Sequence, residues 1–169
     1  SGEKICAMYT KLFGVKTVTF RYFNVYGPRE PIKGPYAPVV GLFLRQFRAD
    51  QVLTVVPDGT QRRDFTHVDD IVIGVKSVLL TDSSTKKLYE LYNIGNNKTE
   101  SLQNFITVIE QAMGKKAIKV MYPMQQGDVP RTFADVDELI KDYEYSPRTD
   151  IKNGIGSFVS WFKNNKLIK

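Results

Sequence analysis

Three segments of the sequence place polar side chains directly after short apolar runs, and their residue types suit an anionic ligand. The first holds Asn24, which follows the apolar run 16–23. A carboxamide both donates and accepts hydrogen bonds, which suits a diphosphate or the edge of a base, and Phe23 and Tyr26 beside it offer flat faces for a ring. The alternative is a plain turn in which Asn24 bonds to its own backbone.

The second segment, residues 58–70, contains two adjacent arginines after a glycine turn. A guanidinium forms paired, charge-assisted hydrogen bonds with phosphate, so Arg62 or Arg63 could hold one. Asp64 would compete for the same guanidinium, and the alternative is surface charge or an internal salt bridge. His67 has no Ser or Cys partner at a suggestive spacing, so we expect a structural hydrogen-bonding role rather than acid–base chemistry.

The third segment, residues 124–135, contains Gln125, Asp128 and Arg131. These side chains mix donors and acceptors, as the hydroxyl groups of a sugar or ribose require. The alternative is a turn stabilised by a pair between Asp128 and Arg131.

Composition excludes several other chemistries. One histidine and one cysteine among 169 residues cannot build a Cys/His zinc cluster, a redox pair or an internal disulfide. The chain has 24 basic and 18 acidic residues, but the basic residues are scattered, so we expect a solvated surface and no nucleic-acid partner. No apolar run approaches the ~20 residues that span a bilayer, and the first residues have no signal-peptide layout. We therefore expect a cytoplasmic protein without membrane contact.

Hydrophobic periodicity predicts an α/β fold. A first helix is expected from the spacing of Ile5, Met8, Tyr9 and Leu12, with a stop at Gly14. Further helices are expected over residues 39–48, 68–78, 102–113, 136–143 and 150–164, and strands over 16–23, 52–56, 88–94 and 117–121. A long loop with several prolines covers residues 28–38. No strand is followed by a glycine-rich turn of the dinucleotide-binding kind, so the chain cannot hold a pyrophosphate by that mechanism.

Taken together, these segments resemble the nucleotide-sugar epimerase and dehydratase group of the extended short-chain dehydrogenase/reductase superfamily. The resemblance runs from residue 1 to about residue 162. It rests on Arg21-Tyr-Phe-Asn24, Tyr26-Gly-Pro28, the run 59–70, Tyr92-Asn-Ile-Gly95, Gly127-Asp128 and Ala134-Asp135.

The resemblance implies the C-terminal substrate-binding domain of such an enzyme. Residues 1–27 would be a remnant helix and strand of the Rossmann domain, and residues 28–169 the nucleotide-sugar-binding region. In the family, NAD sits in the N-terminal Rossmann domain and a Tyr-x-x-x-Lys pair shuttles a proton while hydride passes to and from the sugar. This sequence contains neither that pair nor the cofactor fingerprint. We therefore expect no catalytic residue in this chain, no NAD bound by it, and no activity from it alone.

The resemblance also assigns roles by position. Phe23 would lie against the nicotinamide end of the cofactor, and Asn24 and Arg63 would bind the substrate diphosphate. The remaining substrate-binding positions are Ala37 and Pro38 at the nucleotide, Val56 under the uracil, Asp128 near the ribose, and Gln125 where many relatives have a second phosphate-binding arginine.

The expected function is substrate binding in an NAD-dependent UDP-sugar 4-epimerase of the UDP-glucose, UDP-N-acetylglucosamine or UDP-glucuronate type. The alternatives are a nucleotide-sugar dehydratase or reductase of the same family, or a binding module without catalysis. The first helix resembles one that packs in the family dimer, so we expect a homo-oligomer, and the strand at 16–23 should present an open edge.

Overall fold

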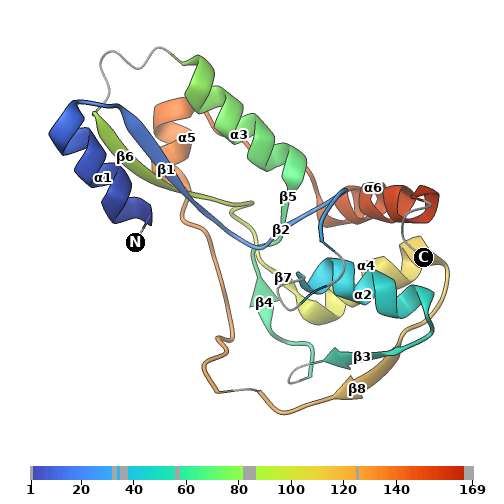
Figure 1. Ribbon diagram of the computed structural model, residues 1–169. Helices are drawn as coiled ribbons and strands as arrows, with labels where there is room; N and C mark the ends of the chain where they lie inside the picture. Colours follow the sequence, from blue (N-terminus) through green and yellow to red (C-terminus); the bar gives the residue numbers. More distant parts are fainter. Residues whose placement is uncertain are drawn as a thin grey trace.

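The computed structural model describes residues 2–31, 34, 38–55, 58–81, 87–124 and 126–165 (Figure 1). The elements in chain order are α1 (Gly2–Phe13), β1 (Thr17–Tyr22), β2 (Val25–Tyr26), α2 (Val39–Arg48), β3 (Val52–Val55), β4 (Arg62–Arg63), β5 (Thr66–His67), α3 (Val68–Leu80), β6 (Tyr89–Ile94), β7 (Glu100–Ser101), α4 (Leu102–Met113), β8 (Ile118–Met121), α5 (Asp137–Tyr143) and α6 (Ile151–Asn164). The fold is α/β, as the sequence predicts.

One part of the molecule is built on a parallel pair of strands, β1 and β6, with Thr17 opposite Tyr89 and Tyr22 opposite Ile94. Helices α1, α3 and α5 surround this pair (Figure 1). Helix α1 ends where Gly14 takes a left-handed φ of 66°, and Arg21 on β1 binds Glu3 on α1 at 2.6 Å. The core of this part consists of Ile71, Tyr92, Ile94, Ala134, Val136, Leu139, Tyr143 and Tyr145.

The other part contains α2, α4 and α6 and the parallel pair β3 and β8; α2 contacts β3, and α6 packs on α4 (Figure 1). Its core is rich in aromatic residues: the rings of Phe65 and Phe105 stack at 4.1 Å, and Tyr26 meets both rings edge-on. Ser101 begins α4 by accepting a hydrogen bond from the Asn104 N–H at 3.1 Å, as its N-cap position predicts.

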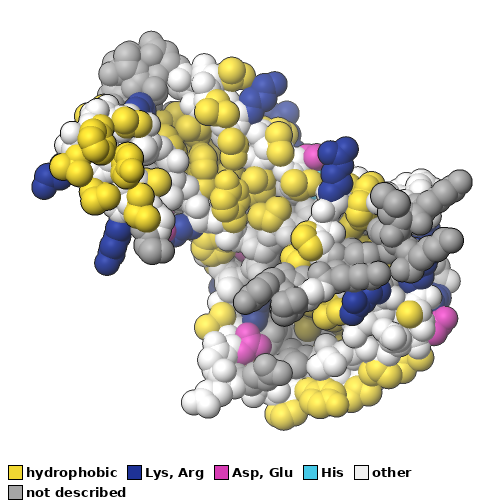
Figure 2. All heavy atoms as spheres, viewed as in Figure 1, with side chains coloured by type: hydrophobic (Ala, Val, Ile, Leu, Met, Phe, Trp, Pro, Cys, Tyr) yellow, Lys and Arg dark blue, Asp and Glu magenta, His cyan; other side chains and the backbone are white. Residues whose placement is uncertain are grey.

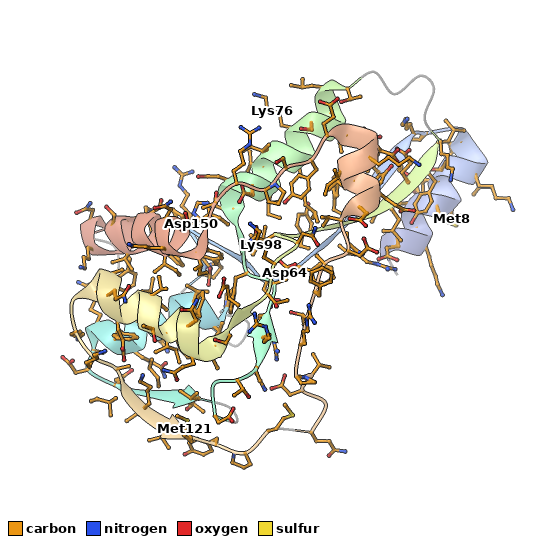
Figure 3. All side chains as sticks on the ribbon, turned by 180° about the vertical axis from the view of Figure 1, so that it is seen from behind. Met8, Asp64, Lys76, Lys98, Met121 and Asp150 are labelled. Carbon is orange, nitrogen blue, oxygen red and sulfur yellow. The ribbon has the colours of Figure 1, made fainter. Side chains whose placement is uncertain are left out.

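Two short strand pairs join the parts. Strand β2 pairs with β5 in parallel, and β4 pairs with β7 in antiparallel. Asp64, between β4 and β5, lies where the connecting segments cross (Figure 3). The predicted boundary between residues 27 and 28 stays a prediction; the structure adds that the chain returns to the sheet of β1 at β6.

Within the described residues, β1 has a strand neighbour on one side only, and no helix is long and apolar enough to cross a membrane. The helices and longer strands lie within about two residues of their expected positions. The two-residue strands β2, β4, β5 and β7 are additions that sequence periodicity does not predict.

Candidate functional site

A cavity of about 320 Å³ lies where the polar segments of the sequence come together. It is lined by Asn24, Val25, Pro38, Val39, Val40, Gln61, Arg63, Phe65 and Leu102. Asn24, Pro38 and Arg63, which the sequence assigns to one site, therefore share one cavity. Phe23 and Asp128 do not line it, and Ala37, Val56 and Gln125 lie outside the described residues.

The direction of Arg63 follows from the local strand geometry. Successive side chains of a strand point to opposite faces, so Gln61 and Arg63 share one face and Arg62 takes the other. Arg62 bonds away from the cavity, from Nε to the Thr99 hydroxyl at 2.9 Å. The main chain of residue 62 is fixed because its N–H donates to the Pro130 carbonyl at 2.9 Å and its carbonyl accepts from the Thr132 N–H at 3.1 Å.

The Arg63 guanidinium is mostly buried, with 16% of the side chain exposed, and is held by three oxygen atoms. Nη2 donates to Asp128 Oδ1 at 2.8 Å and to Gln61 Oε1 at 3.1 Å, and Nη1 donates to the Arg62 carbonyl at 3.0 Å. Within the described part of the chain, Nε–H and one Nη1–H have no acceptor. These two hydrogens are available to an anion in the cavity.

Asn24 has a left-handed backbone, with φ of 36°, a conformation that asparagine tolerates better than most residues. Its Oδ1 accepts from the Thr132 hydroxyl at 3.0 Å, so it does not form the local turn bond that was the alternative. Its Nδ2 has no acceptor among the described residues. In this cavity-lining carboxamide the acceptor is therefore occupied and the donor is not.

Asp64 does not compete for the Arg63 guanidinium, and that expectation is wrong. The side chain is fully buried and accepts from the Asn96 N–H at 2.8 Å, the Ala134 N–H at 3.0 Å and the Thr66 hydroxyl at 3.2 Å. Burial raises the pKa of Asp64, and these hydrogen bonds counteract part of the rise. Asp128 is the carboxylate that pairs with Arg63.

The structure also shows the partners of Asp128 and His67. Asp128 pairs with Arg63 rather than Arg131, whose guanidinium lies over the Phe133 ring at 5.2 Å. His67 caps α3, because its Nδ1 accepts from the Asp69 N–H at 3.3 Å, which is the structural role expected of it.

Gln61 is the site residue that sequence reasoning missed. Its side chain lines the cavity and the residue is 7% exposed. The available signal was its place two residues before Arg63, which puts both side chains on one face of an extended chain.

The residues present do not fit the pyrophosphate of a dinucleotide. Where a strand leads directly into a helix in the described chain, at β5 to α3 and at β7 to α4, the junction has no glycine that would admit a phosphate. Phe23 packs beside the core around β6 rather than in the cavity. The described residues also contain no cluster of three or more His, Cys, Asp or Glu that could hold a metal ion.

Comparison with known proteins gives consistent matches. Protein CapI of Staphylococcus aureus is 35% identical over 96% of this chain and 52% of its own length. UDP-glucuronate 4-epimerase of Thermodesulfobacterium geofontis is 34% identical over 99% of this chain and 50% of its own length. The chain spans about half the length of the curated relatives it matches.

Structure comparison agrees with these sequence matches. The crystal structure of UDP-glucuronic acid 4-epimerase from Bacillus cereus, in complex with UDP-glucuronic acid and NAD, superposes with a TM-score of 0.83 and 33% identity, over 96% of this chain and 50% of that one. The sequence profile of the NAD dependent epimerase/dehydratase family matches residues 1–95. Since that match covers more than half of the 169 residues, the chain belongs to the NAD-dependent epimerase/dehydratase family.

Proposed function

We propose that this chain is the substrate-binding part of an NAD-dependent UDP-sugar 4-epimerase and that its cavity holds the nucleotide sugar. The observation that carries the proposal is that Asn24, Pro38 and Arg63, from three separate segments, line one cavity. The relatives' names support it, because they include UDP-glucuronate 4-epimerases.

The cavity has the chemistry that a sugar-linked diphosphate requires. Arg63 offers two unpaired N–H groups and Asn24 offers an amide, so a diphosphate would receive donors from two sides. Val39, Val40, Phe65 and Leu102 form the apolar remainder of the lining, which suits the less polar parts of a nucleotide sugar. The roles of Ala37, Val56, Gln125 and Asp128 toward the nucleotide stay proposals that rest on the resemblance, as does a contact of Phe23 with NAD.

The proposal separates binding from catalysis. The 169 residues contain no Tyr-x-x-x-Lys pair, and positioning a substrate without the reacting groups lowers a chemical barrier little. We therefore propose that this chain alone binds the nucleotide sugar without epimerising it, and that NAD is bound by full-length relatives rather than by it. We also propose that the protein is cytoplasmic and forms a homo-oligomer.

The test is calorimetric titration of the chain with UDP, comparing Arg63→Ala with Arg62→Ala. Both variants lose one positive charge from the same strand, but only Arg63 lines the cavity. We expect Arg63→Ala to lose about 1.5–3 kcal/mol of binding free energy, roughly a ten- to hundredfold weaker Kd, and Arg62→Ala to bind like the unmodified chain. Equal affinity in the two variants would reject the proposal.

Titration with UDP-glucose, UDP-N-acetylglucosamine and UDP-glucuronate tests which sugar the chain recognises. The sequence of residues 123–128 is similar to that of uronate epimerases, and the loop after Pro28 is similar to that of the glucose and N-acetylglucosamine epimerases. A clear preference for one sugar over UDP alone would assign the substrate. Binding that is equal for all three and for UDP would mean that this chain contacts the nucleotide and not the sugar.

A further inference from the structure

Three side chains beside the cavity form a closed ring of hydrogen bonds. Arg63 Nη2 donates to Gln61 Oε1 at 3.1 Å and to Asp128 Oδ1 at 2.8 Å, and Gln61 Nε2 donates to Asp128 Oδ2 at 2.8 Å. Gln61 and Arg63 come from one face of the chain at β4, and Asp128 comes from a segment more than sixty residues later. The carboxamide therefore bridges the guanidinium and the carboxylate.

The ring requires a particular residue type at position 61. The group must accept from a cation on one side and donate to an anion on the other, and a carboxamide does both with one planar group. A carboxylate there could accept from Arg63 but would face Asp128 Oδ2 without a proton to donate. An aliphatic side chain of the same length would leave both neighbours one partner short.

Partial burial strengthens these hydrogen bonds. Gln61 is 7% exposed, and the Arg63 and Asp128 side chains are 16% and 32% exposed. Hydrogen bonds to charged groups are stronger where water is partly excluded, and a charge left without its partner there is costly. With two acceptors on Nη2 and one on Nη1, the plane of the guanidinium is fixed, and so is the direction of its two unpaired N–H groups.

We propose that Gln61 is a positioning residue, which acts through Arg63 and Asp128 to hold the guanidinium in the orientation that receives the diphosphate. This inference rests on the proposed function and deepens it. It assigns to Gln61 an effect on affinity that comes from its hydrogen-bonding pattern and not from its volume.

The experiment is UDP titration of Gln61→Met and Gln61→Glu at pH 7.5 and at pH 5, each expressed as a ratio to the unmodified chain at the same pH. The ratio removes the titration of UDP itself. Gln111→Met, at an exposed position of α4, is the control for the same substitution elsewhere. Thermal unfolding of each variant establishes that it is folded.

We expect Gln61→Met to bind UDP about tenfold more weakly at both pH values, because Arg63 loses an acceptor and Asp128 a donor. Gln61→Glu should be at least as weak at pH 7.5 and should recover to within about threefold of the unmodified chain at pH 5. A proton on the introduced glutamate restores the missing donor, and the neighbouring carboxylate favours that acid form by raising the pKa of the introduced group. A role in packing alone would give no such recovery, because glutamine and glutamate have the same shape.

The outcomes separate this inference from the proposed function. Binding of Gln61→Met at the unmodified affinity, or a Gln61→Glu ratio that is the same at both pH values, overturns the role of Gln61 while leaving Arg63 in place. Failure of the unmodified chain to bind UDP, or equal binding by Arg63→Ala, overturns the proposed function itself. If Gln61→Met does not fold, the two pH values of Gln61→Glu carry the test, because they compare one protein with itself.

Discussion

Buried carboxylates bind main-chain N–H groups at several places in this molecule, and each one joins distant segments. Asp70 accepts from the N–H groups of Arg148 and Thr149 at 3.0 Å each, and Asp64 joins its own segment to Asn96 and Ala134. Glu30 differs from them. Its Oε1 accepts from the Gly41 N–H in α2 at 3.0 Å, but its Oε2 is buried with no partner in the described residues, and burial raises the pKa of Glu30 to about 7.

This raised pKa predicts that stability falls as pH rises. The folded chain holds the Glu30 proton up to about pH 7, whereas the unfolded chain releases it near the ordinary value of 4.5. The contribution is therefore fully present below pH 4.5 and is lost as the pH rises to about 7. Between pH 5 and pH 8, we expect the unfolding free energy of the unmodified chain to fall by about 1–2 kcal/mol more than that of Glu30→Gln. Urea unfolding at pH 5, 6, 7 and 8 measures both slopes, and parallel slopes would contradict the prediction.

At the scale of elements, the position of α6 depends on a close approach to β2. A Cβ placed on Gly154 would overlap the hydroxyl of Tyr26, a residue that is 2% exposed in the larger core. A Cβ on Gly156, two residues along the same helix, would meet nothing within 4 Å. The absence of a side chain at Gly154 is thus what lets the helix lie on the Tyr26 ring.

The two glycines therefore predict opposite effects of one substitution. Gly154→Ala should destabilise the fold by about 1–3 kcal/mol, because a rigid aromatic ring or the helix must shift. Gly156→Ala should stabilise it by roughly 0.5–1 kcal/mol, because alanine is the better helix former at an exposed interior position. Chemical denaturation of the two variants beside the unmodified chain provides the comparison. A loss of stability in both would mean that the packing around Gly154 is not the cause.

The elements also show how far the sequence can be interpreted without the structure. Helix α4 was predictable at both ends, since Ser101 caps it and Gly114 closes it with a left-handed φ of 76°. The two-residue strands were not, because a pattern that repeats every second residue needs more than two residues to be visible. The ring of hydrogen bonds at the cavity could not be predicted either. The partner of Arg63 comes from position 128 rather than from the adjacent Asp64, and local spacing does not indicate pairs between residues so far apart in the sequence.

The whole molecule exposes an unusually apolar surface around α1. Ile5, Met8, Tyr9, Leu12 and Phe13 are each between 48% and 66% exposed. Figure 2 shows hydrophobic side chains gathered over this region, with Lys and Arg at separate points around it. In the described residues β1 also keeps one edge without a strand neighbour, and surfaces of this kind mark interfaces.

This surface predicts self-association through α1. Met8→Lys should shift the chain toward the monomer, because it places a charge in the apolar patch. Met121→Lys is the matched control: the two methionines are 48% and 53% exposed and lie in opposite parts of the molecule (Figure 3). Sedimentation velocity over a range of concentrations would show the difference. A chain that is monomeric throughout, or one whose association responds equally to both substitutions, would contradict the prediction.

The main chain of residues 61–63 is hydrogen-bonded along both of its edges, through residue 62 on one edge and residues 61 and 63 on the other. The main chain of residue 62 is tied to residues 130 and 132, while those of Gln61 and Arg63 face β7 on the other edge. The scaffold under the cavity is thus fixed by amides and carbonyls that every amino acid except proline carries. Substitutions at positions 61 and 63 consequently break the ring of side-chain hydrogen bonds but leave the main-chain bonds of this segment in place.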